Sequence, residues 1–131
     1  MSRTHKNHPP THRLPHRGDI FLIVDRDENH DKDNENQKYE NSLEAGTRTC
    51  IVVSNNMGNT HSPNIEIVYT TTKKKNKLPT HFITESTPRR STVMCEAVMT
   101  VPKTDLTKYY GALSPMEITR LNRCLRISLG L

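Results

Sequence analysis

Two sets of charged residues in this sequence could act on a phosphate. The first is a single arginine, Arg48, which precedes the apolar residues 50–53, a run typical of a buried strand. The second is the lysine cluster formed by Lys73, Lys74 and Lys75, which follows a run of threonines. A guanidinium donates charge-assisted hydrogen bonds to phosphate oxygens, and clustered lysines attract polyanions. The plainer alternatives are a surface arginine before a strand and a solvated lysine loop.

Charge is distributed unevenly along the 131 residues. Residues 1–18 carry four Lys or Arg and no acid, residues 25–44 carry eight acids against three Lys or Arg, and residues 45–131 carry twelve Lys or Arg against five acids. A basic body favours polyanionic partners. The composition predicts a disordered, His- and Pro-rich basic tail at residues 1–16 and one domain at residues 17–131. The acidic residues 25–44 predict a long mobile loop, either an inert linker or a lid over the binding surface.

The cysteines and the apolar runs indicate the compartment. Cys50, Cys95 and Cys124 are an odd, widely spaced set without a C-x-x-C pair, which signals neither a disulfide framework nor a zinc site. The irregularly spaced histidines near the N-terminus do not form a recognisable metal site. The apolar residues 20–24 are too few for a signal-peptide core or a membrane span. We expect a soluble cytoplasmic protein with no metal, no cofactor and no membrane partner.

The pattern of apolar residues predicts a mainly β (α+β) fold. Strands are expected at residues 20–24, 49–55, 64–72, 81–85 and 91–101, with a hairpin loop between the second and third. A helix is expected from residue 115 to Gly130, because Ser114 and Glu117 form a capping box around Pro115. Consecutive strands without alternating helices favour an antiparallel sheet or small barrel with the C-terminal helix packed against it.

The order of several short motifs resembles that of a known family. The segments "RGDIFLIVD", "RTCIVVSN", "SPNIEIVYTTT", "LPTHF", "STVMCEAVMTV" and the ending "ISLGL" follow one another between residues 17 and 131. They resemble the PemK/MazF toxin endoribonucleases, the mRNA interferases of type II toxin–antitoxin systems. The resemblance implies a compact SH3-like antiparallel β-barrel with a C-terminal helix. It also implies a homodimer that cuts single-stranded RNA without a metal and is blocked by a cognate antitoxin.

The same resemblance implies roles for individual residues. Arg48 matches the family's catalytic arginine and Thr71 the threonine near it, while Glu44 is the candidate general base. Attack of the RNA 2′-OH, which leaves a 2′,3′-cyclic phosphate and a 5′-OH, builds negative charge on the phosphate oxygens that a guanidinium can stabilise. The predicted RNA-binding residues are Ser42, Thr70, Lys73, Lys74, Lys75 and Glu96. Thr70 or Thr72 could replace Thr71 if the strand slips, and Glu96 could instead form a structural ion pair.

Four positions depart from the family pattern. Leu43 stands where many members have a glutamate, Thr49 where most have proline, and Ala97 and Met99 where many have glutamine and arginine. The Ala97 and Met99 departures imply an altered nucleobase preference or weaker RNA binding. Leu43 removes the glutamate that many members carry there, and Thr49 costs some local rigidity but no chemistry. Two other functions stay open: a toxin that binds DNA gyrase without cutting nucleic acid, and a catalytically degenerate member with a regulatory role. The pairing of Arg48 with Thr71 favours the endoribonuclease, because a gyrase poison does not require it.

Overall fold

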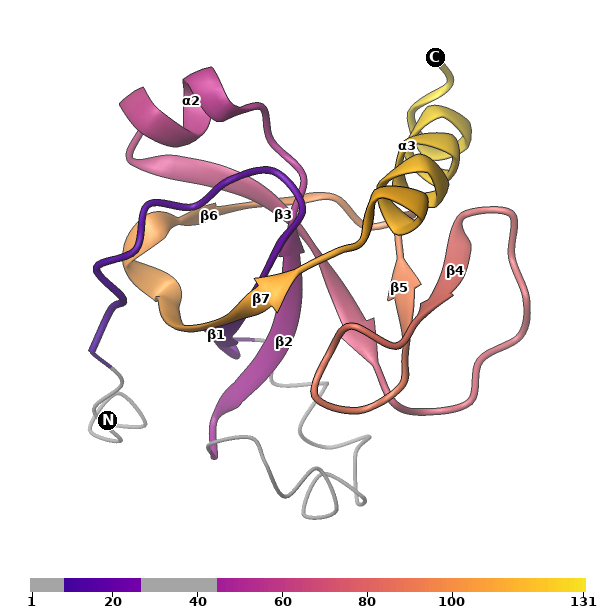
Figure 1. Ribbon diagram of the computed structural model, residues 1–131, viewed down its shortest axis with the longest axis horizontal. Coiled ribbons are helices and arrows are strands. Elements are labelled where there is room, and N and C mark those ends of the chain that lie inside the picture. The colour runs from indigo at the N-terminus through magenta and orange to yellow at the C-terminus, as the bar shows by residue number, and fades with distance from the viewer. Residues whose placement is uncertain (1–8, 27–44) are drawn as a thin grey trace.

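The computed structural model describes residues 9–26 and 45–131, which form a curved antiparallel sheet with two α-helices (Figure 1). The strands, in chain order, are β1 (Asp19–Val24), β2 (Thr47–Val52), β3 (Asn64–Thr71), β4 (His81–Thr84), β5 (Ser91–Met94), β6 (Met99–Pro102) and β7 (Leu106–Ala112). The helices in the described residues are α2 (Asn56–His61), the 3₁₀ turn η3 (Lys103–Asp105) and α3 (Pro115–Leu129). The predicted antiparallel sheet with a C-terminal helix is confirmed.

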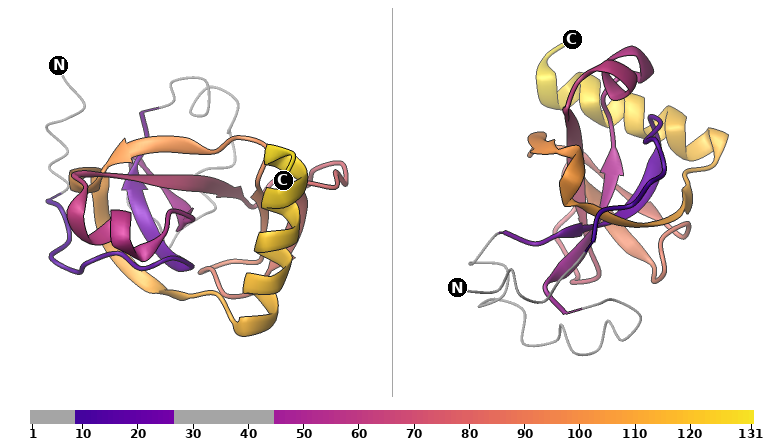
Figure 2. Two further views of the ribbon diagram at one scale, coloured as in Figure 1. Left: turned by 90° about the horizontal axis from the view of Figure 1, so that it is seen from above. Right: turned by 90° about the vertical axis from the view of Figure 1, so that its left-hand side faces the viewer.

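The sheet has the order β4-β5-β3-β2-β1-β7, with β6 paired to the first half of β3. All of its pairs are antiparallel. Figure 2 shows that the strands curve around a common interior, with α3 along one side, so the sheet is barrel-like without being closed. Apolar side chains pack on both faces of this curved sheet.

Alternation along the strands explains the two cores. Ile20 and Phe21 are adjacent and both fully buried, but they belong to different apolar clusters because successive side chains point to opposite faces. One cluster lies between the sheet and α3, where Leu121 and Leu125 pack against strand residues. The other fills the opposite face and includes Ile23 and residues of β2 and β3. Both faces of the central strands are therefore covered.

Helix α3 forms where the capping box predicts it. The Ser114 side chain accepts a hydrogen bond from the Glu117 amide (3.2 Å), and the Glu117 carboxylate accepts one from the Ser114 amide (2.9 Å). Gly130 ends the helix in the left-handed conformation (φ 72°), which glycine adopts without a steric penalty. The apolar side of the helix is used by the core of the same chain.

The structure differs from the sequence prediction at four places. The expected hairpin loop after β2 contains α2, because the Asn55 side chain caps the Gly58 amide at 2.7 Å and buried Asn59 bonds to Ser54. The expected strand at 91–101 is two strands, since β5 pairs with the end of β3 and β6 with its beginning. No strand was predicted for residues 106–112, which form β7. Strand β2 starts at Thr47, so Arg48 lies inside it rather than in front of it.

The segment that precedes β1 contacts the sheet. The Thr11 amide donates to the Leu106 carbonyl at 2.8 Å, and Pro15 is buried. The Arg13 guanidinium lies 3.7 Å from the centre of the Tyr109 ring. Residues 9–16, which the sequence assigned to the tail, thus lie along β7. Residues 1–8 of that tail and residues 27–44 of the acidic loop lie outside the described residues.

Candidate active site

Arg48 is held between two strands with its guanidinium over an aromatic ring. Its backbone pairs with Ile23 of β1. Its side chain lies on the same face of the sheet as that of Cys50, because the two residues are two positions apart in β2. The guanidinium carbon lies 3.8 Å from the centre of the Tyr69 ring, at cation–π distance. Arg48 is only 5% exposed, so little of the residue is accessible to solvent in this structure. Burial lowers the local dielectric and would strengthen its attraction for a phosphate that does enter.

Thr71 is on the same face of the sheet as Arg48. The β2–β3 register pairs Cys50 with Tyr69, and continuing it by two residues on each strand sets Arg48 opposite Thr71. The paired ladder itself ends at Cys50 and Tyr69. The Thr71 hydroxyl accepts a hydrogen bond from the Lys73 amide at 3.1 Å, which turns the chain at the end of β3. The sheet therefore brings the predicted arginine and threonine to one edge.

Alternation distinguishes Thr71 from its two neighbours. Thr70 pairs with Val93 and is 5% exposed, and its side chain is on the other face, with Val68 and the α3 core. The structure does not bring Thr70 and Arg48 together. Thr72 follows the end of β3 and is exposed. Of the three threonines, Thr71 alone has the strand position that matches Arg48.

The three lysines begin two residues after the last residue of β3. Lys73 is partly exposed, and Lys74 and Lys75 are exposed. They lie in the connection to β4, and Thr72 separates them from Thr71. Figure 1 shows the start of β2 and the end of β3 on the side of the molecule away from α2. The lysines and the Arg48–Thr71 edge thus belong to the same region.

Glu96 lies apart from that region. It is in the turn between β5 and β6, and β5 runs away from the edge at which it pairs with Thr71. Its carboxylate contacts His81 Nε2 at 2.9 Å and accepts from the Thr80 hydroxyl at 3.0 Å. Burial alone would raise the pKa of Glu96, but the hydrogen bonds from His81, its own backbone amide and Thr80 outweigh burial and lower it. The structural ion-pair alternative agrees with this geometry.

The remaining predicted site residues, Glu44 and Ser42, lie outside the described residues, as does Leu43. Within residues 9–26 and 45–131, no group of three or more His, Cys, Asp or Glu side chains is arranged to hold a metal ion. In the same part of the chain, no helix is long and apolar enough to cross a membrane.

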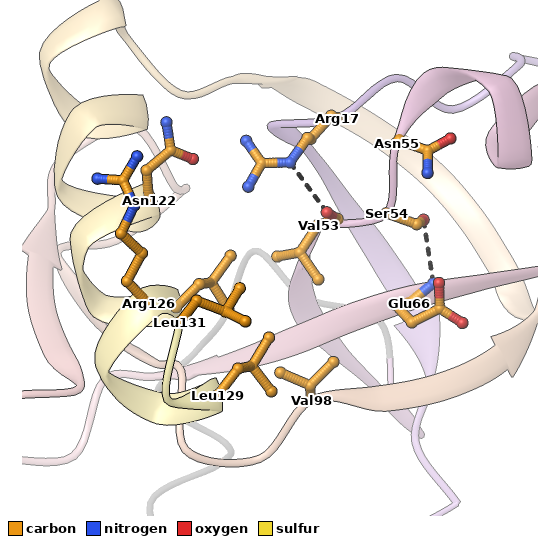
Figure 3. Close-up of a pocket in the computed structure, with 11 residues that line it drawn as sticks. Arg17, Val53, Ser54, Asn55, Glu66, Val98, Asn122, Arg126, Leu129 and Leu131 are labelled. Carbon is orange, nitrogen blue, oxygen red and sulfur yellow. Dashed lines mark hydrogen bonds between the residues drawn. The ribbon is translucent and has the colours of Figure 1, made fainter.

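A pocket of about 440 Å³ lies at the opposite end of the sheet (Figure 3). Arg17 and Arg126 line it together with apolar side chains that include Val53, Val98 and Leu129. The Arg17 Nε donates to the Val53 carbonyl at 2.9 Å, which holds that arginine at the rim. None of the predicted catalytic or RNA-binding residues lines this pocket.

Sequence reasoning missed Tyr69, which contacts Arg48, and the ion pair between Asp105 and Arg26. Tyr69 supplies the ring on which Arg48 lies, and its position two residues before Thr71 was a usable signal, because alternate strand residues share a face. Asp105 holds Arg26 through two hydrogen bonds of 2.9 and 3.0 Å, and this hydrogen bonding raises the pKa of Arg26. Nothing in the local sequence of Asp105 predicted that contact, which spans 79 residues.

The fold defines a class of small toxins. A mycobacterial endoribonuclease solved in complex with its cognate antitoxin is 26% identical, with a TM-score of 0.68, and the match covers 89% of this chain and 96% of that one. A MazE–MazF complex from Deinococcus radiodurans shares the fold at 11% identity, with a TM-score of 0.65 over 91% of this chain and 98% of that one.

Sequence comparisons identify the family. Residues 16–129 match the family described as PemK-like, MazF-like toxin of type II toxin–antitoxin system. Endoribonuclease MazF of Staphylococcus saprophyticus is 27% identical over 88% of this chain and 91% of its own length. Endoribonuclease MazF4 of Mycobacterium tuberculosis is 30% identical over 72% of this chain and 90% of its own. The chain belongs to the PemK-like, MazF-like toxin family, which confirms the resemblance seen in its motifs.

Proposed function

We propose that this toxin is an endoribonuclease that cuts single-stranded RNA by attack of the RNA's own 2′-OH. The observation that carries the proposal is the position of Arg48 and Thr71 on one face at adjoining strand ends, with the guanidinium over Tyr69. The curated relatives named above are endoribonucleases, which supports the same activity for this chain.

In the proposed reaction, the 2′-oxygen forms a bond to phosphorus and the bond to the 5′-oxygen breaks. The products are a 2′,3′-cyclic phosphate and a 5′-hydroxyl end. The Arg48 guanidinium stabilises the negative charge that grows on the non-bridging oxygens. The Thr71 hydroxyl adds a neutral hydrogen bond or orients the guanidinium. Because Arg48 supplies a positive charge, the proposal needs no metal ion.

Proton transfer requires a second group. Arginine does not lose its proton at ordinary pH, so it cannot readily accept the 2′-OH proton. We propose that Glu44, which precedes β2 in the chain, accepts this proton. We propose that Ser42 and the lysines at 73–75 bind the RNA backbone. The leaving 5′-oxygen takes up a proton from the same carboxyl or from water.

The test uses the full-length protein with a long single-stranded RNA and a chelator. We expect the RNA to be cleaved in the presence of the chelator. The products should carry 5′-hydroxyl ends, which a polynucleotide kinase labels without prior phosphatase treatment. The same sequence with 2′-O-methyl groups should resist cleavage, because it lacks the nucleophile. Cleavage of the methylated strand, or products with 5′-phosphates, would contradict the proposed chemistry. No cleavage of either strand would favour a non-nucleolytic toxin.

Two partners follow from the family and are also proposals. The mycobacterial relative was solved with its cognate antitoxin, and we propose that an antitoxin binds this chain as well. We further propose a homodimer, which static light scattering tests directly. A monomer at micromolar concentration would count against it. We also propose the cytoplasm as its location, where mRNA would be its substrate.

A further inference from the structure

The turn between β4 and β5 carries two arginines that no role above uses. Arg89 and Arg90 are both exposed and directly precede the first residue of β5. The turn that carries them is ordered by hydroxyl groups. Buried Thr87 and Ser91 both donate hydrogen bonds to the Arg89 carbonyl, the latter at 2.7 Å. The backbone at Arg89 is therefore held in one conformation by its neighbours.

The same turn is anchored to α3. The Thr84 and Ser86 hydroxyls each donate to the Glu117 carboxylate at 2.6 Å, one to each oxygen. Glu117 lies in the first turn of α3 and is 8% exposed. Because both ends of this contact are in packed elements, the two arginines are presented from a rigid support rather than from a loose loop.

Strand pairing sets this turn beside the proposed catalytic edge. Strand β5 pairs with the end of β3, with Thr92 opposite Thr71. Residues that directly precede β5 and residues that directly follow β3 therefore leave the sheet at the same edge. Figure 1 shows the β4–β5 turn and the end of β3 on the same side of the molecule. Arg89 and Arg90 thus lie at the same end of the sheet as the lysines that begin at Lys73.

The charges of these two segments favour a polyanion. One carboxylate of the turn, Glu85, contacts Arg90 at 3.1 Å, but the side chains are 75% and 68% exposed. An ion pair that exposed contributes little and is readily exchanged for another anion. Arginine forms paired hydrogen bonds with phosphate oxygens. We propose that Arg89 and Arg90 bind RNA phosphates next to the scissile one, extending the lysine cluster into a continuous backbone-binding surface.

This inference rests on the proposed function, and a binding experiment separates the two. The probe is a mixed-sequence, single-stranded 2′-O-methyl RNA, which the proposed chemistry cannot cut. Affinity is measured by fluorescence anisotropy over a series of KCl concentrations. The test variant is Arg89→Gln/Arg90→Gln. The matched control is Arg120→Gln/Arg123→Gln, which removes two exposed arginines from α3.

The number of phosphate contacts fixes the expected result. For single strands the slope of log K against log salt changes by about 0.7 for each phosphate contact. With two contacts removed, the slope of the test variant should be shallower than the wild-type slope by about 1.4. The control should keep the wild-type slope. Arg89→Lys/Arg90→Lys, which retains both charges, should restore most of it. In cleavage assays the Gln variant should raise KM with little change in kcat.

Three results would overturn the inference. Equal slopes for the test and control variants would show that these arginines do not contact the phosphates. Unchanged RNA binding with lost binding of poly-glutamate would assign the turn to an acidic protein partner instead. If the wild-type protein binds no RNA, the proposed function itself fails and this inference fails with it.

Discussion

Glu117 links the end of β4 to the start of α3, and its charge should stabilise the fold. The carboxylate accepts hydrogen bonds from Thr84, Ser86 and the Ser114 amide at 2.6, 2.6 and 2.9 Å. Burial alone would raise its pKa, but these hydrogen bonds outweigh burial and lower the pKa from 4.5 to about 2. At about 1.4 kcal/mol for each pKa unit, the ionised form contributes about 3 kcal/mol to the free energy of unfolding.

The perturbation is Glu117→Gln, which keeps the shape and one acceptor oxygen but removes the charge. We expect the free energy of unfolding at neutral pH to fall by about 1 to 3 kcal/mol, measured by urea denaturation. The folded-state pKa lies below the unfolded-state value, so the stabilisation is present above about pH 4.5 and is lost as the pH falls towards 2. The difference between wild type and variant should shrink over that range.

A matched control separates this effect from general loss of negative charge. Glu85→Gln removes a carboxylate whose side chain is 75% exposed, and it should change the free energy of unfolding by less than about 0.5 kcal/mol. A Glu117→Gln protein as stable as wild type at neutral pH would refute the reasoning. So would a difference in stability that stays constant as the pH is lowered.

Three further outcomes follow from individual contacts. Arg13→Ala removes the 3.7 Å contact with the Tyr109 ring and should lower the free energy of unfolding by about 1 kcal/mol in urea denaturation; no change would mean that the segment before β1 does not stabilise the sheet. Tyr69→Leu should slow RNA cleavage about tenfold by removing the ring under Arg48, while Tyr69→Phe, which keeps it, should not. Burial raises the pKa of Cys50 to about 12, so iodoacetamide should label it only after unfolding, as mass spectrometry can show.

Local signals predicted the parts of the fold that depend on near neighbours. The β-branched run around Ile20 predicted β1, and the capping box of Ser114 with Glu117 predicted the start of α3. Helix α2 was missed because Asn55 and Gly58 are also common in turns. What favours the helix is the bonding of buried Asn59 to Ser54, which a sequence pattern does not reveal.

Long-range pairing explains the other differences. The apolar run from residue 91 to 101 is continuous in sequence, but its two halves pair with different ends of β3. The contact of Arg48 with Tyr69 likewise depends on the β2–β3 register, since the two residues are in different strands. The Arg48–Thr71 match came from family motifs, and strand alternation then separated Thr71 from Thr70.

The most direct test of the central claim is the single-turnover rate of RNA cleavage by Arg48→Ala in the presence of a chelator. Arg123→Ala, which removes an exposed arginine from α3, is the matched control. Loss of the group that stabilises the phosphate charge should slow cleavage by about 100-fold or more, whereas the control should cut at the wild-type rate. Cleavage by Arg48→Ala at the wild-type rate would contradict the assignment of Arg48 as the catalytic charge.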